Sequence, residues 1–75
     1  MIRRQISARL GRDLIATVEA ALRVCGTVNV PMIAEELRTR HLEENIALED
    51  LSEMVMRQAS RMGAAMEFHG SLTDA

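Results

Sequence analysis

The chain has 75 residues, a single cysteine and a formal net charge of −2 at pH 7. A chain of this length forms one small domain, and a lone cysteine excludes a disulfide within the chain. The negative charge argues against a general polyanion binder, and no stretch approaches the roughly 20 apolar residues of a membrane-spanning helix. We therefore expect a cytoplasmic domain without a signal peptide. The use of arginine as the only strongly basic residue favours a bacterial source.

The first helix is predicted to begin near Ser7, a residue type that caps helices well. Residues 1–6 form a basic segment that we expect to be flexible, because Arg3 and Arg4 would fall on the apolar face if the helix began earlier. Gly26 suits the left-handed residue that ends a helix. The spacing of three and four residues defines an apolar stripe, widened by two further residues: Leu10, Leu14, Val18, Ala21 and Cys25, with Ile15 and Leu22. The position of Cys25 on this stripe predicts a buried, unreactive thiol.

The second helix is predicted to begin at Pro31, because proline is favoured at the first helical position. It runs to about His41 or Leu42, and its buried stripe is Ile33, Ala34 and Leu37. The last turn is basic, which suits the negative end of the helix dipole. His41 is therefore interpreted as a helix-end residue. The stretch Thr27–Val30, rich in β-branched residues, precedes this helix, and Val30 is expected to be extended because it precedes Pro31.

The third helix is the longest amphipathic stretch of the chain. Ala47 is its predicted N-cap, and Ile46 and Leu51 occupy the two positions of a hydrophobic staple. Its apolar face is Leu48, Leu51, Val55, Ala59, Met62 and Met66. The helix either ends near Gly63 with fraying through Met66, or the chain becomes extended after Gly63. Residues 70–75 are predicted to form a disordered tail, which leaves residues 7–69 as a single helical domain.

These elements predict an all-α fold of three helices, with a minimal two-stranded β-pairing of Val28–Val30 against Met66–Phe68. The segment Val28–Leu37 (VNVPMIAEEL), followed by Leu48–Gly63, resembles winged-helix and helix-turn-helix modules. The resemblance implies a DNA-binding regulatory domain. The connection between the two helices is longer than the turn of about 3–4 residues in the DNA-binding motif. The third helix also opens with acidic residues where base contacts would be made, so DNA binding is the second hypothesis.

No group of residues in the sequence indicates catalysis. The chain lacks a nucleophile elbow, a glycine-rich phosphate loop and a Ser/His/Asp set. Its soft metal ligands are Cys25, His41 and His69, and no two of them have the short spacing of a zinc site. We therefore expect a protein that is not an enzyme and that has neither a metal site nor a cofactor.

Methionines near the edges of the predicted core faces are the candidate partner contacts. Met54 flanks the core face of the third helix, and Met32 and Met56 lie off the apolar stripes; flexible methionines recur on surfaces that accept partners. A core this small supplies little net stability, which favours a symmetric homodimer. The leading hypothesis is a non-enzymatic, self-associating protein-interaction module. Four arginines are candidate contacts to phosphate or to the acidic middle of a second copy: Arg3, Arg4, Arg9 and Arg12.

Overall fold

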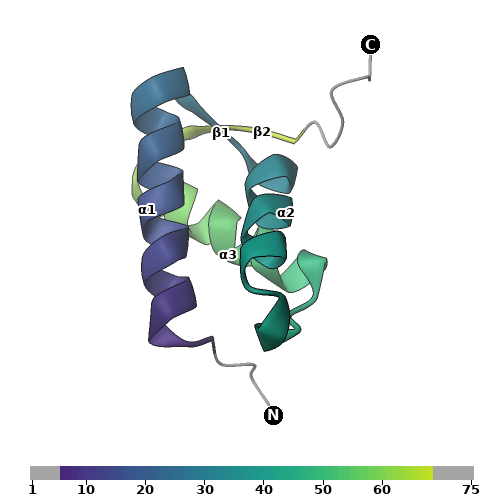
Figure 1. Cartoon of the computed structure of the whole chain (residues 1–75). Helices are drawn as coiled ribbons and strands as arrows, with labels where there is room; N and C mark the ends of the chain where they lie inside the picture. The colour runs from purple at the N-terminus through teal and green to yellow at the C-terminus, as the bar shows by residue number, and fades with distance from the viewer. Residues whose placement is uncertain (1–5, 69–75) are drawn as a thin grey trace.

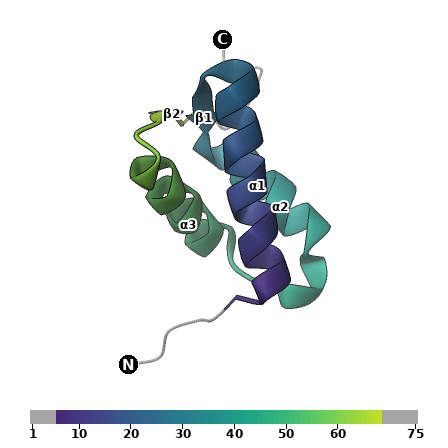
Figure 2. The same ribbon diagram turned by 90° about the vertical axis from the view of Figure 1, so that its left-hand side faces the viewer.

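The computed structural model of the chain describes residues 6–68. The elements follow one another as α1 (Ala8–Cys25), β1 (Thr27–Asn29), α2 (Val30–Arg40), the 3₁₀ turn η1 (Leu42–Glu44), α3 (Leu48–Arg61) and β2 (Ala65–Glu67). Figure 1 shows α1 and α2 side by side with the two strands across one end, and Figure 2 shows α3 packed on one side of this pair. The predicted fold of three helices with a minimal β-pairing is confirmed.

A single apolar core holds the three helices and β1 together. Its buried members are Leu10, Leu14, Val18, Val28, Val30, Ile33, Ala34, Leu37, Ile46, Leu51, Val55 and Ala59. On each helix these residues recur at intervals of three or four, which places them on one face of the helix. The periodicity in the sequence therefore identified most of the core correctly.

The last turn of α1 departs from the prediction. Cys25 is exposed, so the expectation of a buried thiol was wrong. Val24 beside it is 79% exposed. The apolar stripe continues along α1, but this turn extends past the neighbouring elements, as Figure 1 shows, and nothing in the described part of the chain covers it. Ile15, which was expected to widen the stripe, is also exposed.

Local capping explains where the helices begin and end. The Ser7 hydroxyl accepts a hydrogen bond from the Leu10 amide at 3.0 Å, as predicted for the N-cap of α1. Gly26 ends the helix with a φ of 79°, a conformation that glycine adopts without steric cost. The Asn29 side chain accepts from the Met32 amide at 3.3 Å and starts α2 one residue before Pro31. Ala47 is the N-cap of α3, as predicted, and its side chain offers no acceptor.

The two strands form a parallel pair in which Val28 lies opposite Met66. The two predicted segments do pair, but each strand starts and ends one residue earlier than expected. Asn29 caps α2, so Val30 belongs to the first helical turn and not to the strand. Parallel strands require a long crossover connection, and here α2, η1 and α3 together supply it.

The end of α3 follows the second of the two predicted alternatives. The helix stops at Arg61, Met62 is its C-cap, and Gly63 turns the chain with a φ of 67° into the extended β2. Leu48, in the first turn, is 40% exposed. Met54 and Met56 are both partly buried and pack against the core, so the placement of Met56 away from the core was wrong.

The described part of the chain reaches slightly beyond the predicted start of the domain. Ile6, which was assigned to the flexible N-terminus, is partly buried and packs against the core. The rest of that segment and the predicted C-terminal tail lie outside the described residues. Between residues 6 and 68, no helix combines the length and the apolar character that crossing a membrane requires.

Substituting Ala47 with serine should stabilise the domain. Ser7 and Asn29 each accept a hydrogen bond from the amide three residues further on, whereas Ala47 has no side-chain acceptor. Ala47→Ser should raise the free energy of unfolding by about 0.5–2 kcal/mol in a chemical denaturation experiment. Ala16→Ser is the matched control, because Ala16 is exposed in the interior of α1, where serine is a poorer helix former than alanine. Equal effects at the two positions would contradict the cap assignment.

Candidate functional site

A buried histidine at the junction of α1, α2 and η1 is the most unusual feature of the structure. His41 caps the C-terminus of α2 and is only 7% exposed. Its Nε2 atom lies 2.7 Å from Oδ2 of Asp13, a residue on α1 that is 28 positions away in the sequence. An ionised carboxylate can only accept a hydrogen bond, so Nε2 carries a proton and donates it to Asp13.

The other ring nitrogen of His41 faces η1. Nδ1 is buried and has no hydrogen-bond partner among the described residues. It lies 3.7 Å from Oε2 of Glu44, which is too long for a hydrogen bond. The Ser7 hydroxyl donates to this same oxygen at 2.5 Å, and the Ser7 amide donates to the other oxygen of Glu44 at 3.4 Å. The carboxylate of Glu44 is therefore held in place beside an unpaired imidazole nitrogen.

Both carboxylates that flank His41 are stabilised in their ionised form. Partial burial raises the pKa of Asp13, but hydrogen bonds from His41 and Thr17 and the charge of Arg40 outweigh this effect and hold the pKa below its usual range. The hydroxyl hydrogen bond from Ser7 lowers the pKa of Glu44 against the opposing effect of desolvation. The imidazole thus lies between two carboxylates that remain charged at neutral pH.

Arginines neutralise most of the surrounding acidic groups within the chain itself. Arg9 forms an ion pair with Glu43. Arg40 lies 3.3 Å from Oδ1 of Asp13 and 3.4 Å from Glu36, and the latter is the helical pair that the spacing predicts. Since Arg9 is already bound to the acidic middle of its own chain, the structure gives no support to the prediction that it reaches a second copy.

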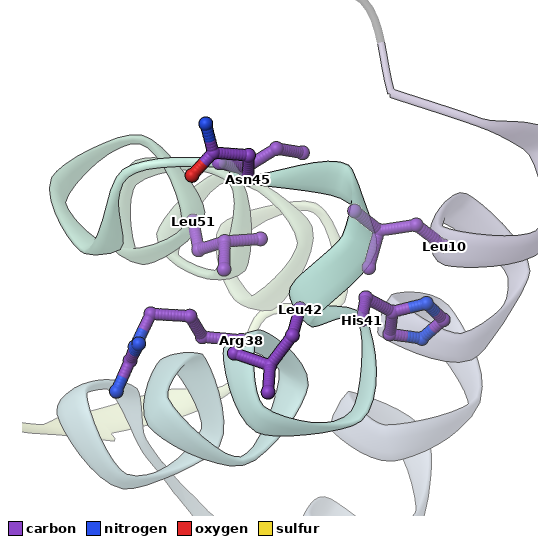
Figure 3. Close-up of a pocket in the computed structure, with 7 residues that line it drawn as sticks. Leu10, Arg38, His41, Leu42, Asn45 and Leu51 are labelled. Carbon is purple, nitrogen blue, oxygen red and sulfur yellow. The ribbon is translucent and has the colours of Figure 1, made fainter.

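A small hollow adjoins the same junction. Figure 3 shows its lining, which combines apolar and polar side chains: Leu10, Arg38, His41, Leu42, Asn45, Ile46 and Leu51. Its volume is about 60 Å³. Pockets that enclose small-molecule substrates usually hold about 300–1,000 Å³, so this hollow has room for water or a single small group and not for a metabolite.

The opposite end of the domain carries exposed apolar groups next to an open strand edge. β2 pairs with β1 along one edge, and within residues 6–68 no strand pairs with its other edge. Glu67 lies opposite Asn29, the cap of α2, so Phe68 emerges beside the start of that helix. Phe68 is 58% exposed, and Met32, in the first turn of α2, is 42% exposed.

The residues predicted as contact sites do not form one cluster. Met32 is exposed, whereas Met54 and Met56 pack against the core, so Met32 is the most accessible of the three methionines. Among the predicted arginines, Arg9 is paired with Glu43, and Arg12 is exposed on α1. Arg3 and Arg4 lie outside the described residues.

Sequence reasoning missed the cluster around His41. Cysteine and histidine were the only metal ligands that we considered in the sequence. The segment His41–Glu44 (HLEE) nevertheless contains three ligand-bearing side chains, and one oxygen or nitrogen from each of His41, Glu43 and Glu44 lies within 4.8 Å of the others. A histidine followed within three residues by two glutamates was the feature of the sequence that could have indicated this cluster.

Comparison with protein-family models, curated proteins and solved structures finds no match for this chain.

Removing the Asp13 carboxylate should destabilise the domain by leaving the Nε2–H group of His41 without an acceptor. A buried donor without a partner costs about 1–3 kcal/mol, so Asp13→Ala should lower the free energy of unfolding by that amount at pH 7. Arg12→Ala, at an exposed position of the same helix, should change it by less than about 0.5 kcal/mol.

The difference in free energy of unfolding between the wild type and Asp13→Ala should become smaller at low pH. Because the pKa of Asp13 is lowered in the folded state, its stabilising effect is complete above the unfolded carboxyl pKa of about 3.9 and is lost as the pH falls through the lower folded value. The stability difference between the wild type and Asp13→Ala should therefore shrink below about pH 4. A difference that is constant from pH 7 to pH 3 would contradict the role assigned to this carboxylate.

Proposed function

We propose that the chain is a non-enzymatic protein-interaction module that self-associates into a two-fold symmetric dimer through the open edge of β2. The observation that carries this proposal is the combination of an unpaired strand edge with two exposed apolar side chains, Met32 and Phe68, at the same end of the domain. An open edge presents backbone donors and acceptors to another strand, and an exposed apolar surface favours association by burial.

A second copy of the chain is the occupant that this edge fits best. In an antiparallel pairing of two β2 strands centred on Met66, Ala65 of one copy would face Glu67 of the other, so the two glutamates would not face each other. Such a contact uses the same surface on both subunits, which is the geometry of a closed two-fold dimer. It would also extend a sheet that has only two strands, a size that is marginal in isolation.

The non-enzymatic part of the proposal is supported by the size of the His41 hollow. Its volume of about 60 Å³ is too small to enclose a metabolite. The polar groups of the junction mostly contact one another: Asp13 contacts His41, Arg9 contacts Glu43, and Ser7 contacts Glu44. We find no exposed nucleophile and general base close together among these contacts.

The charge distribution does not favour DNA binding. On the outer face of α3, Glu49 and Glu53 are exposed, and Arg57 is 3.1 Å from Glu53. On α2, Arg38 pairs with Glu35 at 2.6 Å. A surface whose arginines are matched by adjacent carboxylates lacks the unbalanced positive field that attracts a phosphate backbone.

Sedimentation equilibrium from micromolar to millimolar protein tests self-association. We expect a reversible monomer–dimer equilibrium. Burial of one large apolar side chain contributes about 1.5–3 kcal/mol, so Met32→Glu and Phe68→Glu should each weaken the dimer at least about tenfold. Leu42→Glu is the matched control, because Leu42 is exposed at the opposite end of α2. A monomer at every concentration, or a dimer that only Leu42→Glu disrupts, would contradict the proposed interface.

A DNA titration addresses the alternative function. Against short duplexes at physiological salt, we expect no affinity tighter than the non-specific range of about 10⁻⁴–10⁻⁶ M, and no dependence on sequence. Arg12→Ala, which removes an exposed arginine, should leave this weak binding almost unchanged. Nanomolar, sequence-dependent binding that weakens steeply with salt would instead establish a DNA-binding domain.

A further inference from the structure

We propose that His41, Glu43 and Glu44 form a binding site for a divalent transition-metal ion such as Zn²⁺. The inference rests on the unpartnered Nδ1 atom of His41, which lies 3.7 Å from Oε2 of Glu44, and on the nearby carboxylate of Glu43. It is independent of self-association. The side chain of His41 is 7% exposed, and Nδ1 has no hydrogen-bond partner among residues 6–68. Buried polar atoms are nearly always paired, so an unpaired one in this position points to a ligand.

The contacts of the imidazole indicate the kind of ligand. Nε2 donates a hydrogen bond to Asp13 at 2.7 Å, so Nδ1 is the ring nitrogen that remains to bind a ligand. Nδ1 lies 3.7 Å from Oε2 of Glu44, which is too far for a hydrogen bond. A cation between these two atoms can bind both. A cation between them would satisfy the nitrogen and neutralise part of the carboxylate charge.

The distances are compatible with an ion of the size of zinc. Ligand atoms about 2.1 Å from a tetrahedral zinc ion lie about 3.4 Å from one another. Nδ1 of His41 and Oε2 of Glu44 are 3.7 Å apart, and one ligand atom from each of the three side chains lies within 4.8 Å of the others. A small rotation of the exposed Glu43 side chain would bring its carboxylate within coordination distance of an ion bound to His41 and Glu44. A set of one imidazole and two carboxylates suits zinc and other first-row metals better than Mg²⁺, which prefers oxygen ligands.

Two neighbouring residues, Asp13 and Arg9, should have opposite effects on the affinity of this site for zinc. Asp13 accepts the Nε2 proton of His41 and thereby orients the ring, as carboxylates do behind histidines that bind metals. It is a positioning residue that does not contact the ion. Arg9 forms an ion pair with Glu43, so it competes with a cation for this carboxylate and adds repulsion. Removing Asp13 should therefore weaken binding, and removing Arg9 should strengthen it.

Zinc titration by calorimetry, together with thermal unfolding, tests the site. The wild type and a Cys25→Ser/His69→Gln double variant are compared first, because Cys25 is exposed and the double variant keeps His41 as the only histidine and has no cysteine. We expect one Zn²⁺ per chain in both proteins, a higher melting temperature with zinc, and no comparable effect of Mg²⁺. The melting temperature should rise because zinc that binds only the folded protein shifts the unfolding equilibrium toward the folded state.

Single substitutions in the double variant then locate the ion. Asp13→Asn should weaken zinc binding about 10–100-fold, Glu43→Gln should weaken it at least tenfold, and Arg9→Ala should strengthen it. Glu49→Gln is the matched control, because Glu49 is an exposed glutamate of α3, and it should have no effect. Circular dichroism confirms that each variant is folded at the titration temperature.

Four results would overturn the proposal. The first is no zinc binding at millimolar metal, and the second is binding that disappears in the Cys25→Ser/His69→Gln variant. The third is binding that Glu43→Gln and Arg9→Ala leave unchanged, because both residues are exposed and their replacement does not disturb the core. Binding that responds to Glu49→Gln as strongly as to Glu43→Gln would likewise assign the ion to general surface charge.

Discussion

The hydrogen bond between His41 and Asp13 is the contact on which one end of the domain depends. His41 is the only buried polar or charged residue among the described residues. A polar group taken out of water destabilises the fold unless it is paired. Asp13 supplies that pairing from α1 and thereby fixes the end of α2 against it. The turn η1 follows His41 directly in the chain. Its last residue, Glu44, accepts a hydrogen bond from the hydroxyl of Ser7 at the start of α1. Two segments far apart in the sequence are joined here by polar contacts next to an apolar core.

The sequence was informative where structure depends on neighbouring residues. The start of α1 followed from capping at Ser7, and the start of α3 followed from the staple positions Ile46 and Leu51 and the periodicity of apolar residues. The paired strands were also predictable, because Gly63 interrupts the helical pattern and β-branched residues precede α2. Exposure was harder to predict because it depends on which elements lie opposite. Cys25 continues the stripe of α1, but that turn has no neighbour to cover it.

The candidate sites depended on contacts that no local pattern encodes. The pairing of His41 with Asp13 spans 28 positions, and periodicity gives no information about such a contact. Met56 appeared to lie off the core face of α3, yet it packs against the core in part, because side chains on the flank of a helix can also reach a neighbouring element. Arg9 was a candidate contact to phosphate or to a second copy, and no local pattern indicated that η1 would bring Glu43 to it within the same chain.

The proposed functions are located at opposite ends of one small domain. The strands lie at one end of the domain in Figure 1, and the segment that contains η1 lies at the other end. Met32, in the first turn of α2, and Phe68, directly after β2, belong to the strand end. This separation allows a metal ion to stabilise the junction of α1 and η1 without occupying the surface proposed for self-association. It also makes the two proposals independent in experiment, since a variant at one end should leave the other end intact.

The protonation of the His41 ring is the most direct test of the arrangement at the centre of this structure. A long-range ¹⁵N–¹H correlation spectrum of the labelled protein at neutral pH, without metal, reports which ring nitrogen carries the proton. For the proposed metal site we expect a protonated Nε2 that is hydrogen-bonded to Asp13 and an Nδ1 that carries no proton beside Glu44. A spectrum that shows the proton on Nδ1, or on both nitrogens, would contradict the proposed site, because Nδ1 would then have no lone pair for a metal ion.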